Sequence, residues 1–178
     1  MNKSIISLII AGFIMLWSYR AFSCTAFCLK KDGKVVAGKS YDWRTNEGFV
    51  LTNLRGVKKT SIPTGYGDVF YWTSKYGSIT FNQFGKEMPN GGMNEKGLVI
   101  EVLWLNDTEY PAPAHLKYVN ELQWLQYQLD NHSTVAEVIE SRKEIQIVPM
   151  FAPLHYFVAD AEGNAAVIEF LDGEIVVH

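Results

Sequence analysis

Ala21-Phe22-Ser23-Cys24-Thr25-Ala26-Phe27 is the stretch on which the interpretation of this 178-residue chain depends. It ends an N-terminal apolar run and begins the first strand-like segment. Two interpretations meet at Cys24. The residue is the first of a mature protein if the chain is cut before it, or it is a small hydrophobic residue near the start of a strand. The choice between them decides most of the expected function.

The residues before Cys24 have the pattern of a secretory signal peptide. Lys3 gives a basic start, and residues 5–17 are apolar except for Ser7 and Gly12. At 1.5 Å per residue this run is too short to cross a hydrocarbon core of roughly 30 Å. Ala21-Phe22-Ser23 supplies the small-x-small end of a cleavage site. We therefore expect residues 1–23 to be removed and residues 24–178 to form one domain in the periplasm or outside the cell.

Two alternatives explain the same apolar run. It could be a buried N-terminal helix, since the same residues make protein cores. It could also be a lipoprotein signal, which would lock the Cys24 thiol in a thioether and leave a membrane-anchored binding protein. Lipoprotein signals usually carry Leu three residues before the cysteine, where this chain has Ala21. In neither case do we expect a stable membrane span.

Composition limits the partners. The chain has a net charge of −3, and loss of Lys3 and Arg20 with the signal peptide would take it to −5. No basic patch is evident, so we do not expect nucleic acid as a partner. Aromatic residues make up 13% of the chain, which suits a large apolar pocket or a well-packed core. The length suffices for one modest domain.

The chain has two cysteines, Cys24 and Cys28. Four residues along a strand span about 13 Å, whereas the Cα atoms of a disulfide lie roughly 4.4–6.8 Å apart. If the segment is a strand, the two cannot pair. Cys24 is then a free thiol in an oxidising compartment, and such a thiol needs a reason.

Strand-like segments dominate the rest of the chain, with an Asp32-Gly33 turn of the hairpin type between the first two. We expect residues 55–68 to be loop and residues 88–97 to be a Gly, Pro and Asn-rich turn region. The run 98–105 is almost continuously apolar apart from Glu101, which predicts a strand covered on both faces. The expected strands are 24–30, 35–41, 49–54, 70–72, 78–84, 98–105, 154–159, 165–170 and 174–177.

Two helices interrupt the strands. Apolar residues at Tyr118, Leu122, Leu125 and Leu129 predict an amphipathic helix that ends at 130–131. Thr134 and Glu137 then form a capping box for a second helix. Segregated strands and helices predict an α+β fold with an antiparallel sheet. One helix pair covers one face only, so the strand 98–105 needs a second layer that the expected elements do not supply.

A mature N-terminal Cys24 would carry its own catalytic pair. The thiol can attack a carbonyl, and the α-amine, with a usual pKa of about 7.7–8.0, can act as its base. No histidine is required for this chemistry. None of the four histidines lies in a recognisable Cys-His motif, which argues against a thiol protease.

Three segments carry a family resemblance: Cys24-Thr25-Ala26-Phe27, Gly38-Lys39-Ser40-Tyr41-Asp42-Trp43 and Gly92-Met93-Asn94-Glu95-Lys96-Gly97-Leu98. Together they resemble the choloylglycine hydrolase and penicillin V acylase family, whose members are N-terminal nucleophile (Ntn) hydrolases of linear amides. The resemblance implies an αββα sandwich, a small-molecule amide substrate, no cofactor, no metal and a possible homotetramer. It runs over residues 24–178 but covers only about the first half of a family member.

The resemblance also implies roles for individual residues. Cys24 would be the nucleophile, and Asp42 a partner that holds and polarises the N-terminus. Lys39 stands where the family usually has Arg, which keeps the charge and loses the planar guanidinium. Trp104 stands where the family often has Asn or Tyr, and its indole N–H could still donate to an oxyanion. The structural alternatives are a buried strand cysteine, a strand-end turn residue, a solvated Lys and a core Trp.

Trp104 and the signal sequence favour the exported Gram-negative type of acylase over the bile-salt hydrolases. The resemblance to that type implies hydrolysis of phenoxyacetyl amides such as penicillin V or, as in some members, of acyl-homoserine lactones. The family's remaining catalytic Asn and a further Arg fall beyond residue 178, and the chain stops within the strand-like run 174–178. We therefore expect an N-terminal portion with little activity by itself, or a non-catalytic remnant of the family.

Overall fold

Thirteen strands and two short α-helices make up the described part of the chain, which is residues 24–114 and 116–178 of a computed structural model. The expected signal peptide, residues 1–23, lies outside it. The strands are β1 (Thr25–Lys31), β2 (Lys34–Ser40), β3 (Phe49–Asn53), β4 (Lys58–Thr60), β5 (Tyr71–Thr73), β6 (Ser78–Asn82), β7 (Pro89–Asn94), β8 (Val99–Trp104), β9 (Lys117–Val119), β10 (Ile145–Ile147), β11 (Leu154–Ala159), β12 (Ala165–Leu171) and β13 (Glu174–Val177). The helices are α2 (Glu121–Asn131) and α3 (Val135–Glu140), followed by the 3₁₀ turn Ser141–Lys143.

Seven strands form one sheet in the order β13-β12-β11-β8-β7-β6-β3. Every neighbouring pair in it is antiparallel. Three two-stranded units accompany the sheet: the hairpin β1–β2, the pair β4–β5 and the parallel pair β9–β10. The predicted α+β class with an antiparallel sheet is confirmed, and β11 to β13 form the expected meander.

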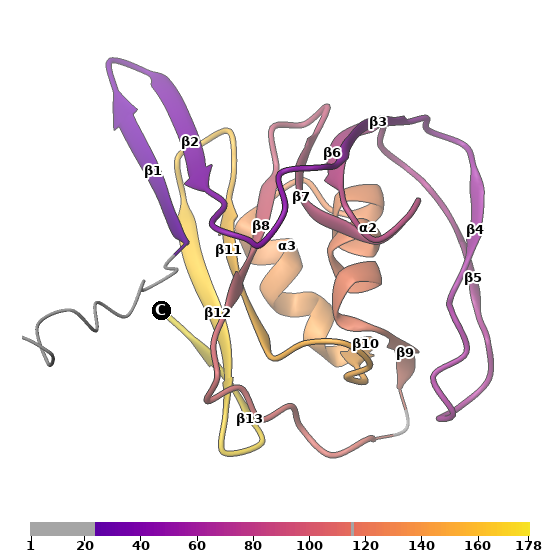
Figure 1. Ribbon diagram of the computed structural model, residues 1–178. Helices are drawn as coiled ribbons and strands as arrows, with labels where there is room; N and C mark the ends of the chain where they lie inside the picture. The colour runs from indigo at the N-terminus through magenta and orange to yellow at the C-terminus, as the bar shows by residue number, and fades with distance from the viewer. Residues whose placement is uncertain (1–23, 115) are drawn as a thin grey trace, which may run out of the picture.

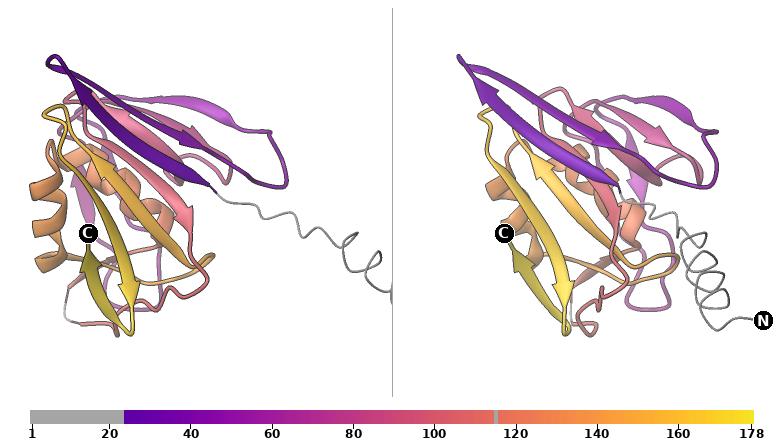
Figure 2. Two further views of the ribbon diagram at one scale, coloured as in Figure 1. Left: turned by 90° about the vertical axis from the view of Figure 1, so that its left-hand side faces the viewer. Right: turned by 60° about the vertical axis from the view of Figure 1, so that its left-hand side comes forward.

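The layers are helices, sheet and hairpin. Helices α2 and α3 lie behind one face of the sheet, and the β1–β2 hairpin crosses the other face at an angle (Figures 1 and 2). The core fills the space between the sheet and α2, where Ile100, Val102 and Tyr156 meet Leu125 and Leu129. This arrangement is an α, β, β sequence of layers, and no helix covers the outer face of the hairpin within the described residues.

The hairpin turns at Asp32 and Gly33, whose φ angles of 51° and 74° confirm the predicted turn with two left-handed residues. Alternation along the strands gives the hairpin two different faces. Phe27, Leu29 and Val36 point away from the sheet and are 43%, 64% and 57% exposed. Lys30 on the other side donates to the carbonyl of Glu162 in the β11–β12 turn, which ties the hairpin to the sheet.

Helix α2 differs from its prediction, because almost every residue on its surface is buried. It begins after Asn120, whose side chain accepts from the backbone N–H groups of Leu122 and Gln123, so Tyr118 lies in β9 and outside the helix. The sheet covers one side of α2, and the β4–β5 hairpin reaches the polar side. There Asp130 accepts from Lys59 and from the indole of Trp72.

Helix α3 begins as predicted. The Thr134 hydroxyl accepts from the N–H of Glu137, and the Glu137 carboxylate accepts from the N–H of Thr134, so both halves of the capping box are formed. Val135 and Val138 face the core.

The sequence did not predict four of the strands: β4, β7 and the short parallel pair β9 and β10. Residues 55–68 include β4, and residues 88–97 include β7, a central strand of the sheet. Gly92 lets β7 pack closely against β6. A Cβ at residue 92 would lie 2.6 Å from the carbonyl oxygen of Ile79 on β6. Asn94 bonds through its side chain to the carbonyls of Leu129 and His132 and so fixes the end of α2 to the sheet.

Strand β8 is less covered than predicted. Ile100 and Val102 are buried against the helices, while Val99, Glu101 and Leu103 on the hairpin side are only partly buried. Within the described residues, no helix has both the length and the apolar character needed to cross a membrane.

Candidate active site

Cys24 immediately precedes β1 and is half-buried. Thr25 pairs with Ser40 and Ala26 with Lys39, so Cys24 lies at the end of β2. Thr25 donates its N–H to the Ser40 hydroxyl at 3.1 Å, which closes the open end of the hairpin. Both cysteines are free thiols, as the strand geometry predicts.

Lys39 carries its charge into a nearly closed space. Its side chain is only 6% exposed, and its ammonium lies 3.4 Å from the carboxylate of Glu101. The same ammonium donates to the carbonyl of Asn90 at 3.1 Å and lies 4.7 Å from the centre of the Tyr41 ring. Burial lowers the pKa of Lys39, while the negative charges of Glu101 and of the Cys24 thiolate act to raise it. Ala26 is opposite Lys39, so Cys24 and Lys39 lie on the same face of the hairpin.

Tyr41 is held by a chain of side-chain hydrogen bonds. Its hydroxyl donates to Gln83 and accepts from the Asn90 amide, both at 2.8 Å. Gln83 in turn donates to the carbonyls of Thr45 and Glu47 and fixes the loop after β2. Burial, and then the nearby Cys24 thiolate, raise the pKa of Tyr41 to about 12, so the phenol stays protonated at neutral pH.

Trp104 lies at the end of β8. The centres of its ring and of the Trp43 ring are 5.7 Å apart. It is 45% exposed, so it is not a core residue. Its indole N–H donates to the Asn106 side chain at 2.6 Å. The N–H that we expect to stabilise an oxyanion would have to exchange this bond for one to the substrate.

Asp42 follows β2 directly and is exposed. Its side chain makes no hydrogen bond or ion pair with any residue that the structure describes. The structure thus brings Lys39 and Tyr41 together near Cys24 and leaves Asp42 in solvent beside them. The role of Asp42 toward a free N-terminus stays a prediction.

A cavity of about 680 Å³ opens beside Lys39. Lys39, Glu101 and Asn90 line it, together with the loop after β2 and parts of β3 and β6, whereas Cys24 and Trp104 do not. The aromatic lining residues are Tyr41, Trp43, Phe49 and Phe81. An apolar cavity with a few convergent polar groups is the usual form of a small-molecule site.

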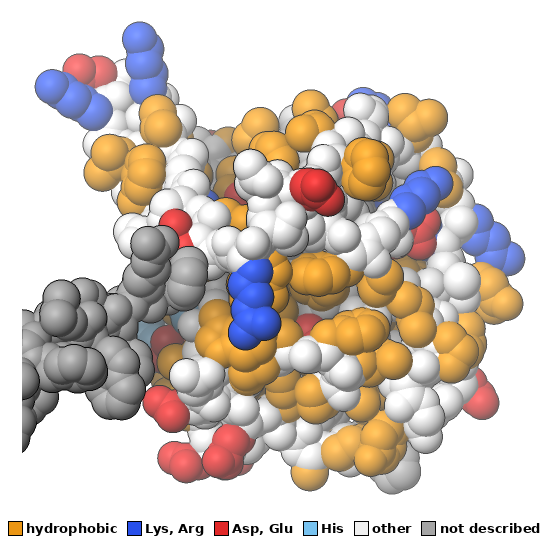
Figure 3. All heavy atoms as spheres, in the orientation of Figure 1, with side chains coloured by type: hydrophobic (Ala, Val, Ile, Leu, Met, Phe, Trp, Pro, Cys, Tyr) orange, Lys and Arg blue, Asp and Glu red, His pale blue; other side chains and the backbone are white. Residues whose placement is uncertain are grey.

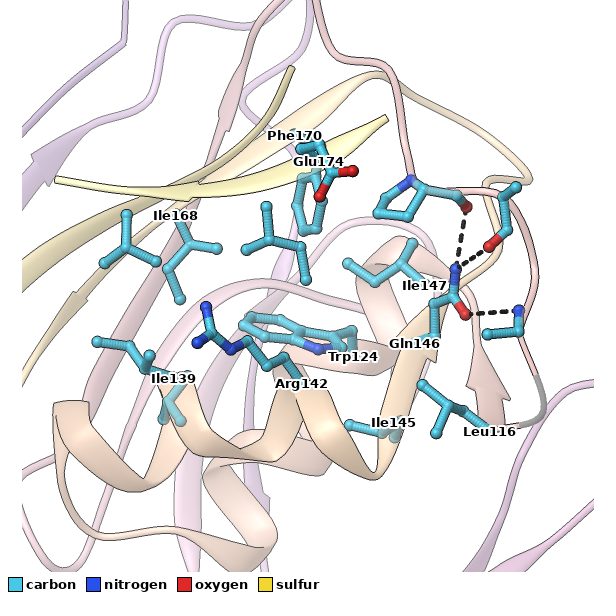
Figure 4. Close-up of a pocket in the computed structure, with 16 residues that line it drawn as sticks. Leu116, Trp124, Ile139, Arg142, Ile145, Gln146, Ile147, Ile168, Phe170 and Glu174 are labelled. Carbon is cyan, nitrogen blue, oxygen red and sulfur yellow. Dashed lines mark hydrogen bonds between the residues drawn. The ribbon is translucent and has the colours of Figure 1, made fainter. Parts of the chain in front are cut away.

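A second cavity, of about 360 Å³, lies on the helix side of the sheet (Figure 4). Trp124, Ile168 and Phe170 line it, together with Gln146. The Gln146 amide is already engaged by the backbone of Pro111, Ala112 and Ala114. None of Cys24, Lys39, Tyr41 and Trp104 lines this cavity, so it is separate from the candidate active site.

Sequence reasoning missed Tyr41, Asn90 and Glu101 as parts of the site. One signal was available for Glu101, because a lone carboxylate in an apolar strand needs a buried cation as its partner. Asn90 and Tyr41 gave no such signal, because their contacts join segments far apart in the chain.

Comparisons with known proteins identify the family of the chain. The family model for linear amide C-N hydrolases, choloylglycine hydrolase family, matches residues 24–178. A penicillin V acylase of Pectobacterium atrosepticum is 33% identical over 159 residues, which are 80% of this chain and 42% of that protein.

Two solved structures have the same fold. That of penicillin V acylase from Agrobacterium tumefaciens has 30% identity and a TM-score of 0.71, over 88% of this chain and 49% of its own. A variant of conjugated bile acid hydrolase from Clostridium perfringens has 22% identity and a TM-score of 0.70, over 85% of this chain and 49% of its own.

The chain therefore belongs to the choloylglycine hydrolase family of linear amide C-N hydrolases. Its fold is that of the Ntn-type hydrolase structures just named. It spans about half the length of the relatives that it matches.

Proposed function

We propose that this chain supplies the nucleophile and part of the binding site of a linear amide hydrolase, and that Cys24 acts as its N-terminal residue. The observation that carries the proposal is the position of Cys24, half-buried at the start of β1 and on the face of the hairpin that carries the buried cation Lys39. A thiolate is the reactive form of cysteine, and a neighbouring cation favours it.

The reaction follows from the two groups on Cys24. The sulfur attacks the amide carbonyl carbon while the α-amine takes the thiol proton. The C–N bond then breaks as that proton passes to the leaving nitrogen, and water hydrolyses the thioester. Trp104 can donate its indole N–H to the oxyanion once Asn106 releases it, and Lys39 can balance negative charge near the sulfur.

The cavity beside Lys39 suggests the acyl group. Tyr41, Trp43, Phe49 and Phe81 present aromatic rings around it, and aromatic rings pack well against one another. An aromatic acyl group such as phenoxyacetyl would fit this lining. Two relatives named above as penicillin V acylases support this substrate class over bile salts.

The mechanism requires export and cleavage before Cys24, which places the protein in the periplasm or outside the cell. A uniform lipid thioether on Cys24 would exclude the mechanism, because it consumes the thiol. Assembly into a homotetramer is a further expectation from the family, and light scattering of the purified protein measures it.

N-terminal sequencing and intact-mass measurement of the exported protein test the proposal. We expect a chain that starts at Cys24 with a free amine and an unmodified thiol. A chain that starts elsewhere, or that carries a diacylglyceryl group, would contradict it. In a full-length enzyme that contains this segment, Cys24→Ala should abolish hydrolysis of penicillin V, whereas Cys28→Ala should retain it.

A further inference from the structure

We propose that Glu101 is a positioning residue that holds the ammonium of Lys39 in place against Cys24. The inference rests on the proposed role of Cys24 as nucleophile. Glu101 lies on a strand of the main sheet, and its carboxylate acts on the thiol only through Lys39.

The contact geometry is the first support. Glu101 lies in the middle of β8 and points to the face of the sheet that the hairpin crosses. Its side chain is 14% exposed and that of Lys39 is 6% exposed, with 3.4 Å between the ammonium and the carboxylate. Such a pair joins the sheet to β2 on the face of the hairpin that also carries the candidate nucleophile.

Gly91 is the second support. It pairs with Glu101 across β7 and β8, and a Cβ at residue 91 would lie 1.8 Å from a carboxylate oxygen of Glu101. The backbone of Gly91 is not left-handed, so conformational freedom does not explain the glycine. The missing side chain at residue 91 instead leaves the space that the carboxylate occupies.

The charges around Lys39 complete the argument. It faces Glu101 from β8, Cys24 from the start of β1, Tyr41 from the end of β2 and the Asn90 carbonyl from β7. Burial lowers the pKa of Lys39 and raises that of Glu101, so each group alone tends toward its neutral form. Their mutual attraction opposes both shifts. Without the carboxylate, the ammonium would lose its proton or leave the site, and Cys24 would lose its cation.

Alkylation of Cys24 by iodoacetamide, measured against pH, tests the inference without a substrate. The background is Cys28→Ser, because these two residues are the only cysteines and lie in one tryptic segment between Arg20 and Lys30. We expect Glu101→Gln to slow alkylation at neutral pH by about tenfold and to move the pH profile upward. Gly91→Ala keeps both charges but displaces the carboxylate, so it should have an effect in the same direction.

Two double-mutant cycles and one control distinguish a positioning role of Glu101 from general damage to the fold. Glu101→Gln should add nothing in a Lys39→Met background, and Gly91→Ala should add nothing in a Glu101→Ala background. Glu169→Gln removes another partly buried, paired carboxylate, on β12, and should leave the rate unchanged.

Unchanged or faster alkylation in folded Glu101→Gln would overturn the proposal. Faster alkylation would mean that the negative charge of Glu101 itself, and not the position of Lys39, dominates at the thiol. If Glu101→Gln does not fold, Gly91→Ala alone decides in the same way. If Cys24 is not the nucleophile, Cys24→Ala leaves turnover intact in the full-length enzyme, while the coupling of Glu101 to the thiol is still measured.

Discussion

Cys24 and Cys28 are the same residue type but have different neighbours, so we expect their thiols to differ in reactivity. Both are half-buried and free, and both lie on the sheet side of the hairpin. Cys28 is paired with Ala37 in the middle of the hairpin, whereas Cys24 lies at its open end, next to the pair Thr25 and Ser40. By strand register Lys39 is diagonal to both cysteines, so the α-amine that cleavage would expose on Cys24 is the group that distinguishes them.

This difference predicts the order of labelling at the scale of residues. A mild alkylating reagent applied to the folded, processed protein should modify Cys24 before Cys28. Fragment-ion mass spectrometry of the tryptic peptide that contains both residues resolves the two sites. Modification of Cys28 first would count against the nucleophile assignment. The denatured protein is the control for the fold, since unfolding removes Lys39 from Cys24 and leaves only its own α-amine to distinguish it from Cys28, so the preference for Cys24 should decrease.

At the scale of elements, α2 is stabilised by one buried charge pair. Lys59 on β4 lies 3.0 Å from Asp130 near the end of α2, and both side chains are almost fully buried. Trp72 on β5 and Gln126 within the helix also donate to Asp130. The four groups fasten the β4–β5 hairpin to the helix.

Removal of the cation alone should be costly. Lys59→Met leaves the Asp130 carboxylate buried without a counter-charge, and we expect it to lower the free energy of unfolding by roughly 3–5 kcal/mol. Lys59→Met with Asp130→Asn should lose less, because the amide is neutral and still accepts from Trp72. Urea unfolding followed by Trp fluorescence measures both. Equal loss in the single and double variants would contradict this account.

The start of α3 should make stability depend on pH. Hydrogen bonds from the Ser133 backbone and hydroxyl and from the Thr134 backbone lower the pKa of Glu137 below its usual 4.5. A carboxyl with a lowered pKa stabilises the fold above the unfolded-state value and loses that contribution as the pH falls through the folded-state value. Glu137→Gln should therefore cost roughly 0.5 kcal/mol at pH 7, because solvent screens this exposed carboxylate, and progressively less below pH 4.5.

Urea unfolding at several pH values measures this difference. Glu140→Gln is the matched control, since its pair with Lys143 is 65% exposed on both sides and should contribute little at any pH. A cost of Glu137→Gln that does not change between pH 7 and pH 3 would show that the charge of Glu137 is not involved.

At the scale of the whole molecule, apolar side chains remain open on the hairpin side. Phe27, Leu29 and Val36 project from the hairpin, and Val50, Ile79, Phe81 and Met93 add exposed apolar surface on the sheet (Figure 3). Exposed patches of this kind mark surfaces that another layer covers, or they promote aggregation. The relatives that share the fold are about twice as long as the matched segment.

We therefore expect the chain by itself to have little or no amidase activity. The chain covers only about half the length of its relatives, and loss of a single oxyanion donor typically costs about 10²–10³ in rate. Purified 24–178 should be assayed with penicillin V and with a glycine-conjugated bile salt. Rapid hydrolysis of either would contradict the prediction. Co-expression with the C-terminal half of a penicillin V acylase relative should restore activity and reduce aggregation, and Cys24→Ala should abolish the restored activity.

The sequence by itself determined the local features of this protein. The Asp32-Gly33 turn, the capping box at Thr134 and Glu137 and most strands follow from residue types and spacings within a few positions. The family also followed from the sequence, because the motifs around Cys24, Lys39 and Asn94 are continuous segments.

Only the tertiary structure decided what those residues contact. Strand β7 was not predicted, because its segment is rich in Gly and Asn. Its glycines are required by close contacts with the neighbouring strands and not by local backbone propensity. The pairing of Lys39 with Glu101, and of Tyr41 with Asn90, joins residues 62 and 49 positions apart. Such contacts depend on which strands become neighbours and which faces they share, and no pattern of nearby residues encodes that geometry. The physical reason is that burying a charge or an amide is unfavourable unless it is paired, and the partners of these groups lie far away in the sequence.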